Sequence, residues 1–163
     1  MAALATDPTR IFVGYGLQTG RAMGTIPREA PVHEMPVAEG LMTSFAIGLA
    51  LAGRKPVVYI ERADFIWHAT DAIVNHLAAM PIISGGEYRA GVIIRVTVGG
   101  TQKPLFTGYT HTRDNSAALR AASPIPVFCL REAAHIATYY AEAAHRQANG
   151  ESTILYEYRD LMA

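Results

Sequence analysis

The sequence predicts an α/β fold: a three-layer, doubly wound and mostly parallel sheet with helices on both faces. Short apolar runs rich in β-branched residues alternate along the chain with longer helical runs, which is typical of a sheet covered by helices. A length of 163 residues with 50% hydrophobic residues supplies one sizeable core and is too short for two ordinary domains. We therefore expect a single domain over residues 11–163, preceded by a flexible amino-terminal tail over residues 1–10.

The first half of the domain begins with a short strand that ends in Gly14-Tyr15-Gly16. The stretch from there to Pro36 is rich in Gly, Pro and Thr, which indicates a loop. Small and aliphatic residues all round predict a helix packed on several sides, and Gly53 with Pro56 ends it. The elements expected in this half are a strand over 11–13, a helix over 37–53 and a buried strand over 57–60.

In the second half, Asp64 is placed to cap a helix that ends before Gly85-Gly86. Residues 101–114 show no usable period and are expected to form a loop, and a long loop in a compact domain is usually functional. The expected elements are a helix over 65–80, a strand over 91–98, a helix over 115–122, a strand over 126–130, a helix over 131–148 and a strand over 153–158.

Charge and composition exclude several partners. Fourteen basic and fourteen acidic residues give a formal net charge of zero, so no overall field attracts nucleic acid or an anionic membrane. The most apolar stretch, residues 41–52, is far shorter than the roughly 20 residues that span a bilayer. No secretory signal precedes it, and the single cysteine suits a reducing compartment, so we expect a cytoplasmic protein. A charged fraction of only 17% favours a surface covered by a partner chain.

Common catalytic and cofactor motifs are absent from the sequence. The glycines at 14, 16 and 20 have one residue more than a dinucleotide fingerprint, and we expect no helix after them. The six histidines contain no helical zinc pair with an adjacent Glu, and no serine lies in a Gly-x-Ser-x-Gly turn. We expect no metal ligands in this chain.

One carboxylate is left in an unusual place. Glu39 lies at the start of the most apolar helix of the chain, within the segment Met35-Pro36-Val37-Ala38-Glu39-Gly40. An acidic residue in a first helical turn often serves only to complement free amides and the helix dipole. Position alone leaves capping and function equally open.

Several segments together resemble the pyrimidine-binding domain of thiamine diphosphate-dependent enzymes. They are the segment around Glu39, the run from Ala46 to Val58, Asp64-Phe65 with Ala69 to Asn75, Ser84-Gly85-Gly86, the strand containing Arg95, and Thr110-His111. The beta chains of 2-oxo acid dehydrogenase first components and the transketolases are the most similar groups. The resemblance spans about residues 11–158 and implies the thiamine diphosphate-binding fold.

The resemblance implies roles for three residues, and a fourth, Glu61, stands where relatives carry an apolar residue. Glu39 matches the glutamate that hydrogen-bonds the aminopyrimidine ring, and a carboxyl beside an apolar helix can hold or share a proton with that ring. The imino tautomer favoured in this way removes the thiazolium proton of the cofactor. Phe65 matches the aromatic residue that stacks on the pyrimidine, with core packing as the alternative. His111 matches a histidine near the substrate carbonyl, with a plain surface role as the alternative. Glu61 lies near the cofactor or simply at a strand end.

Two departures from the family pattern change the expected assembly. Leu17 stands in the region where the beta chains carry an acidic pair, so a role held by that pair is not available. The sequence contains neither the Gly-Asp-Gly nor the Asn-Asn of the diphosphate and magnesium motif, and we expect no counterpart of the carboxy-terminal domain of the beta chains. We therefore expect the diphosphate and Mg²⁺ to be held by a separate diphosphate-binding subunit, in a heterotetramer.

The function expected from the sequence is that of a pyrimidine-binding subunit in a split thiamine diphosphate enzyme. It would act on a small carbonyl substrate, a 2-oxo acid or a ketose, by decarboxylation or by acyl or ketol transfer, and be inactive alone. Two alternatives remain: a non-catalytic interaction module that kept the fold, and a stand-alone nucleotide-binding α/β domain that uses residues 14–20.

Overall fold

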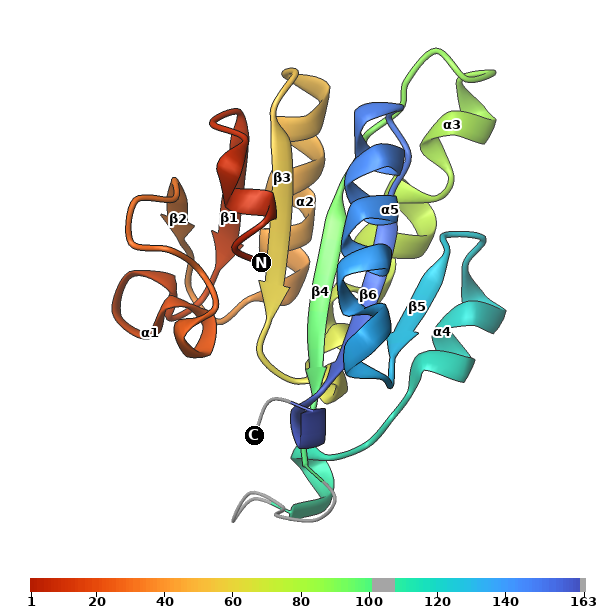
Figure 1. Ribbon diagram of the computed structural model, residues 1–163. Coiled ribbons are helices and arrows are strands. Elements are labelled where there is room, and N and C mark those ends of the chain that lie inside the picture. Colours follow the sequence, from red (N-terminus) through yellow and green to blue (C-terminus); the bar gives the residue numbers. More distant parts are fainter. Residues whose placement is uncertain (101–107, 162–163) are drawn as a thin grey trace.

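The computed structural model describes residues 1–100 and 108–161. The strands are β1 (Arg10–Gly14), β2 (Val32–Glu34), β3 (Lys55–Ile60), β4 (Ile93–Val98), β5 (Val127–Leu130) and β6 (Thr153–Tyr158). They form one sheet in the order β2-β1-β3-β4-β6-β5, and every neighbouring pair is parallel (Figure 1). The carboxyl ends of the strands therefore meet along one edge, at the bottom of Figure 1. The prediction of a parallel α/β sheet is confirmed.

Helices cover both faces of this sheet. They are α1 (Leu17–Gly24), α2 (Glu39–Leu51), α3 (Met80–Ile83), α4 (Ser116–Ala122) and α5 (Ile136–Ala148). One core cluster joins the sheet to α2 and α4 through residues such as Ala46 and Leu119, and the other joins it to α5 through Tyr140 and Ala143. In Figure 1, α5 crosses in front of the sheet and α2 lies behind β3. The molecule therefore has the three layers that the sequence predicts.

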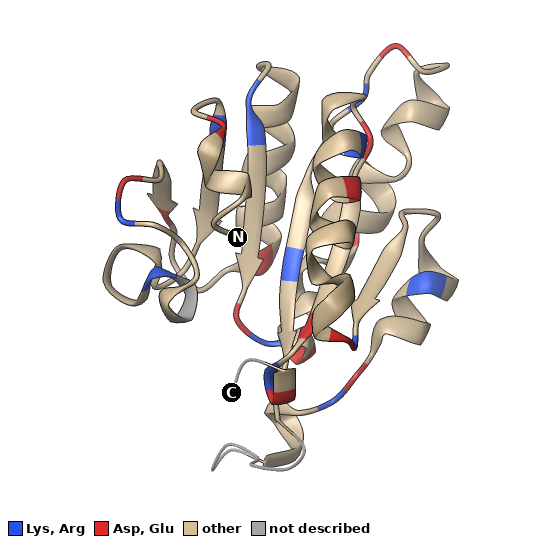
Figure 2. Ribbon diagram, in the orientation of Figure 1, with Lys and Arg blue, Asp and Glu red and all other residues tan. Residues whose placement is uncertain are grey.

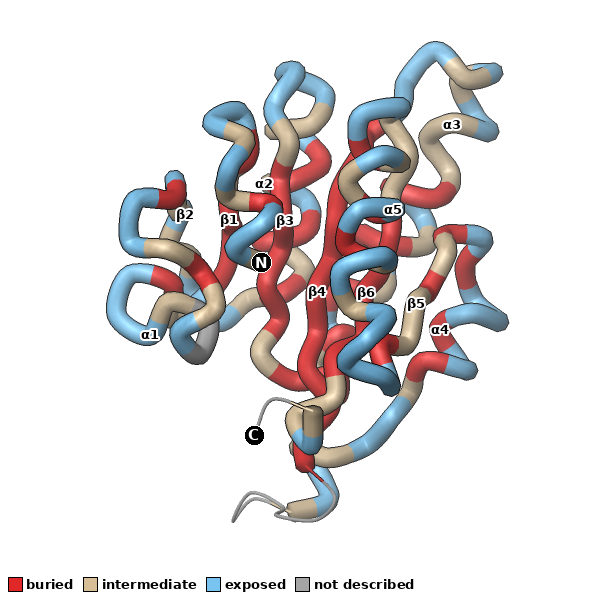
Figure 3. Tube along the Cα trace, in the orientation of Figure 1, coloured by how far each residue is buried: buried red, intermediate tan, exposed pale blue. Residues whose placement is uncertain are grey.

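The central strands are buried on both faces, which explains their continuous apolar sequences. In β3, Val57 and Tyr59 belong to the core cluster under α5, whereas Val58 and Ile60 belong to the cluster under α2. All six residues of β4 are buried, and Figure 3 shows the middle strands as an unbroken buried layer.

One ionic cluster lies inside this core. Arg95, in β4, is fully buried, and its Nε donates to the carboxylate of Glu157 in β6 at 2.7 Å. The hydroxyl of Tyr140, on α5, donates to the other carboxylate oxygen of Glu157. The Tyr59 ring lies 4.8 Å from the Arg95 guanidinium carbon. These partners balance a charge that would otherwise be very costly to bury.

The segment after β1 differs from the predicted loop. It contains helix α1, directly after the glycines where we expected no helix, and also the three-residue edge strand β2. The carboxylate of Glu34 accepts hydrogen bonds from the backbone amides of Gly16 and Gln18, at 2.5 and 2.7 Å. A carboxylate from β2 thus satisfies free amides at the start of α1, and it stabilises a glycine-containing helix that local propensity disfavours.

The helix predicted over residues 65–80 is present, but it is not a regular α-helix. The chain forms a 3-10 segment, η2 (Ala63–Ala69), then a π-helical segment, η3 (Ala72–Leu77), and then the short α3. The side chain of Asp64 does not cap a helix; it pairs with Arg113 instead. A change of helix type within one segment is common where a helix adapts to a functional site.

The first ten residues are not a detached tail in this structure. Leu4 is buried in the core cluster under α5, and Arg10 opens β1 while its guanidinium donates to the Leu4 carbonyl at 2.8 Å. Figure 2 shows basic and acidic residues interspersed along the chain, several of them side by side in the loops. Within the described chain, no helix has both the length and the apolar character that a bilayer crossing requires.

Candidate active site

The candidate site lies where α2 begins, beside η2. A pocket of about 500 Å³ is lined by Val37, Ala38, Glu39, Gly40, Leu41, Phe65 and His68. Two segments that are far apart in the sequence build it, and Gly40 brings them together. A Cβ at residue 40 would lie 2.9 Å from the backbone oxygen of His68, so only glycine allows this close approach.

Glu39 is the only carboxylate among the residues that line this pocket. It is the first residue of α2 and is 7% exposed. None of the described residues donates a hydrogen bond to its side chain or forms an ion pair with it. The residue is largely buried while its unpaired carboxylate faces a pocket, so it is placed to interact with a ligand. This arrangement favours function over the simple capping role.

Most of the other residues that line this pocket are apolar. Phe65 in η2 is half-buried, and Val37 and Leu41 are 64% and 52% exposed. An aromatic ring beside a single polar group suits a flat ligand with one hydrogen-bonding edge. The sequence prediction that Glu39 and Phe65 share one site is consistent with this geometry.

His111 lies next to Phe65 rather than in the pocket lining. It ends the 3-10 segment η4 (Gly108–His111), and the centroids of its ring and the Phe65 ring are 5.1 Å apart, edge to face at 85°. The Nδ1 atom of His111 lies 2.9 Å from the Thr110 hydroxyl oxygen. The predicted loop over 101–114 is partly described: residues 101–107 lie outside the described residues.

Glu61 follows β3 but is not brought to this pocket. Its side chain is 44% exposed, and its carboxylate lies 3.3 Å from the guanidinium of the neighbouring Arg62. No hydrogen bond or ion pair within the described chain joins Glu61 to Glu39 or Phe65. Of the two readings left open by the sequence, the structure agrees with a residue at a strand end.

His68 is a pocket residue that the sequence reasoning missed. It lies three residues after Phe65, and residues i and i+3 share a face in a 3-10 helix. That spacing would have identified His68 if the segment had been recognised as a 3-10 helix.

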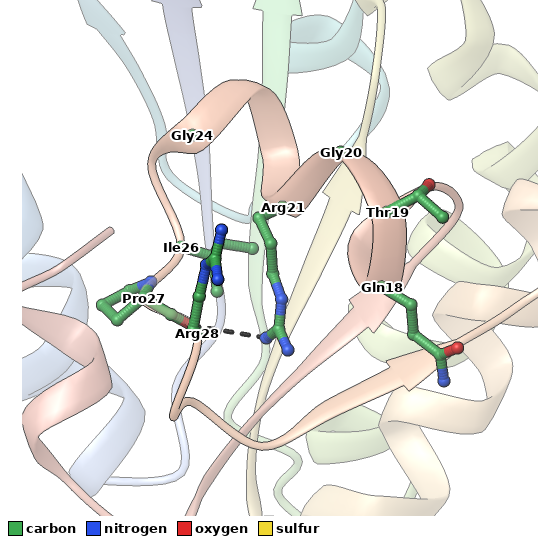
Figure 4. A pocket seen from close by; sticks show the side chains of 8 residues that line it. All are labelled: Gln18, Thr19, Gly20, Arg21, Gly24, Ile26, Pro27 and Arg28. Carbon is green, nitrogen blue, oxygen red and sulfur yellow. Dashed lines mark hydrogen bonds between the residues drawn. The ribbon is translucent and has the colours of Figure 1, made fainter.

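A second hollow lies beside the edge strand β2. It has about 610 Å³ and is lined by Gln18, Thr19, Gly20, Arg21, Gly24, Ile26, Pro27 and Arg28 (Figure 4). Arg21 donates to the backbone oxygens of Pro27 and Ala30, each at 3.3 Å. No group of three or more His, Cys, Asp or Glu side chains that could hold a metal ion occurs in the described parts of the chain.

Comparisons with known proteins agree with this geometry. Residues 9–163 match the family model described as the transketolase pyrimidine-binding domain. The chain is 33% identical over 110 residues to the pyruvate dehydrogenase E1 component subunit beta of Mycoplasma pneumoniae, which covers 63% of this chain and 34% of that protein. It is 28% identical over 86 residues to the 2-oxoisovalerate dehydrogenase subunit beta of Pseudomonas aeruginosa, which covers 53% and 24%.

Solved structures show the same fold. A split-gene transketolase described as an inactive beta4 tetramer has a TM-score of 0.71 at 20% identity, over 94% of this chain and 46% of that one. A thiamine diphosphate-dependent 4-hydroxybenzoylformate decarboxylase of Rhodococcus jostii also has a TM-score of 0.71, at 13% identity, over 99% and 29%. The chain spans about a third or less of the length of the two dehydrogenase beta subunits. The family match over residues 9–163 shows that this chain belongs to the transketolase pyrimidine-binding domain family.

Proposed function

We propose that this chain is the pyrimidine-binding subunit of a thiamine diphosphate-dependent enzyme that acts on a 2-oxo acid or a ketose. The observation that carries the proposal is the buried, unpaired Glu39 carboxylate beside Phe65 in an apolar pocket. A flat aminopyrimidine ring with a hydrogen-bonding nitrogen suits this set of groups. The match of residues 9–163 to the transketolase pyrimidine-binding domain supports the same ligand.

Each side chain has a distinct part in this proposal. Glu39 holds or shares a proton with the ring nitrogen. Phe65 offers an aromatic face to the pyrimidine. His111, next to Phe65, donates a hydrogen bond to the carbonyl oxygen of the substrate or shuttles a proton. Bound thiamine diphosphate supplies the electron sink for breaking a carbon–carbon bond beside a carbonyl group.

The diphosphate and Mg²⁺ belong, in this proposal, to a second subunit. The described residues contain no cluster of carboxylates or other metal ligands, which a magnesium diphosphate requires. Beta subunits among the relatives and a split-gene transketolase with this fold support a divided enzyme. Val37 and Leu41, exposed at the rim of the pocket, suit contact with that subunit. We propose a cytoplasmic heterotetramer of two chains of each kind.

Binding of the cofactor tests this assignment. The chain is co-expressed with the product of the adjoining gene, and thiamine diphosphate with Mg²⁺ is titrated by calorimetry into the complex and into each chain alone. We expect tight binding to the complex only, and turnover with a 2-oxo acid or a ketose. Binding of thiamine diphosphate to none of the three samples would contradict the proposal and favour a non-catalytic interaction module.

A further inference from the structure

The segment that carries His111 is attached to η2 by a set of contacts that the proposed chemistry does not itself need. The side-chain amide nitrogen of Asn115 donates to the Ala63 backbone oxygen at 2.8 Å. The Tyr156 hydroxyl donates to the side-chain oxygen of the same Asn115 at 2.6 Å. Arg113 reaches Asp64 in the same region. These contacts attach residues 108–115 to η2, the segment that carries Phe65.

Asp64 makes the strongest of these attachments. One carboxylate oxygen accepts from Arg113 Nε at 2.5 Å, and the other accepts from the backbone amide of Arg113 at 3.3 Å. Because Asp64 binds both the side chain and the backbone of Arg113, it fixes the position of the backbone there as well as that of the guanidinium. The Asp64 side chain is 4% exposed, so this carboxylate depends on its partner, whereas Arg113 is 43% exposed. The hydrogen bond that Arg113 donates to Asp64 also raises the pKa of Arg113.

The opposite side of the segment is held by the end of β4. A Cβ added at Gly99 would lie 2.1 Å from the His111 backbone oxygen and 3.2 Å from the Thr112 Cα. Backbone thus packs directly on backbone there, with no side chain between. The segment thus has two fixed points: the backbone of His111 and Thr112 packs on Gly99, and the backbone amide of Arg113 is bonded to Asp64.

We infer that Asp64 and Arg113 are positioning residues that hold His111 against Phe65. Asp64 directly precedes Phe65, and Arg113 lies two residues after His111, so this ion pair joins the segments that carry the two rings. The part of the inference that concerns turnover rests on the function proposed above for His111. The part that concerns the placement of His111 does not.

The variant that tests this inference is Arg113→Gln. It removes the cation, so the buried Asp64 carboxylate keeps only the hydrogen bond from the backbone amide of residue 113. Lys55→Gln is the matched control: Lys55 pairs with Asp7 at 2.8 Å, at the opposite end of the sheet. The first readout is the NMR spectrum of the His111 ring in the purified chain, assigned with His111→Gln. We expect Arg113→Gln to shift these resonances, because the ring contact with Phe65 is lost, and Lys55→Gln to leave them unchanged.

The second readout is kinetic and uses the assembled complex. We expect Arg113→Gln to lower kcat by about tenfold or more, since a small displacement of a catalytic group has a large effect on rate. The affinity for thiamine diphosphate should stay within about twofold, because Glu39 and Phe65 keep their places. Arg113→Lys keeps the cation and should recover part of the lost rate.

Two results would overturn the inference. One is an unchanged His111 spectrum in Arg113→Gln, and the other is a shift of equal size in the Lys55→Gln control. Failure of the proposed function looks different: a complex without any turnover leaves the NMR comparison intact, and that comparison then decides the placement of His111 alone.

Discussion

Two hollows of this chain differ in how they are built, and the difference shows which of them is suited to bind the cofactor. The hollow of Figure 4 is the larger, at about 610 Å³ against about 500 Å³, yet a single stretch from Gln18 to Arg28 lines all of it. The pocket at Glu39 joins two segments separated by more than twenty residues and contains a buried carboxylate. Volume alone would select the wrong one. Convergence of distant elements on one buried polar group is the better criterion.

The largest effect expected is from Glu39→Gln. The amide has nearly the same shape as the carboxyl, but it cannot hold or share the proton that the proposed chemistry needs, so turnover should be abolished while the complex still assembles. Turnover and size-exclusion profiles measure the two properties. Glu29→Gln, an exposed change beside Arg28 at the other hollow, is the control and should leave turnover unchanged. Full activity of Glu39→Gln would remove Glu39 from the mechanism.

A pair of glycine substitutions compares the two hollows by stability. Gly40→Ala places a Cβ 2.9 Å from the His68 backbone oxygen, so α2 and η2 must separate, at a cost of about 1–3 kcal/mol. Gly20→Ala in α1 meets nothing within 4 Å and should stabilise the chain by about 0.5–1 kcal/mol. Urea unfolding of both variants gives the comparison. Equal effects of the two substitutions would mean that the close approach at Gly40 is not required.

Phe65→Ala tests the apolar wall of the Glu39 pocket. Removing the ring should weaken thiamine diphosphate binding to the complex by about 1 kcal/mol beyond the loss of buried area, because the stacking contact is lost. Calorimetric titration measures this change, and the unfolding midpoint shows how much stability is lost with it. An unchanged affinity would identify Phe65 as a residue of the core only.

The smallest effect is expected from Arg28→Gln in the larger hollow. The proposed cofactor site does not include Arg28, so the affinity of the complex for thiamine diphosphate and its turnover should both stay within about twofold of the original values. The same calorimetric and kinetic assays apply. A tenfold loss of affinity would show that both hollows contact the cofactor, and the assignment of the cofactor to the Glu39 pocket alone would then be wrong.

Most of the sheet could be predicted because its central strands are buried on both faces and therefore have continuous apolar sequences. The edge strand β2 could not, since three residues between prolines carry no such signal. Helix α1 was missed because the Glu34 carboxylate that satisfies its first amides comes from a different element. Local sequence does not record a partner supplied by the tertiary fold.

The same reason limits what the sequence says about the site. Glu39 and Phe65 could be proposed together because the segments that surround them are recognisable as motifs. Asp64 was interpreted as a helix cap, because its partner Arg113 lies 49 residues away in the sequence. His68 was missed because a 3-10 segment places residue i+3, rather than i+4, on the face of Phe65.

The buried pair of Arg95 and Glu157 has a consequence for variation and for protein engineering. Loss of either partner leaves one charge in a sealed interior, a cost of about 3–5 kcal/mol that is a large fraction of the stability of a small domain. The two residues lie on neighbouring strands but 62 residues apart in the sequence. A substitution of one is therefore expected to require a compensating substitution of the other. A chimera that takes β4 from one parent and β6 from another is expected to fold only when both parents supply this ion pair.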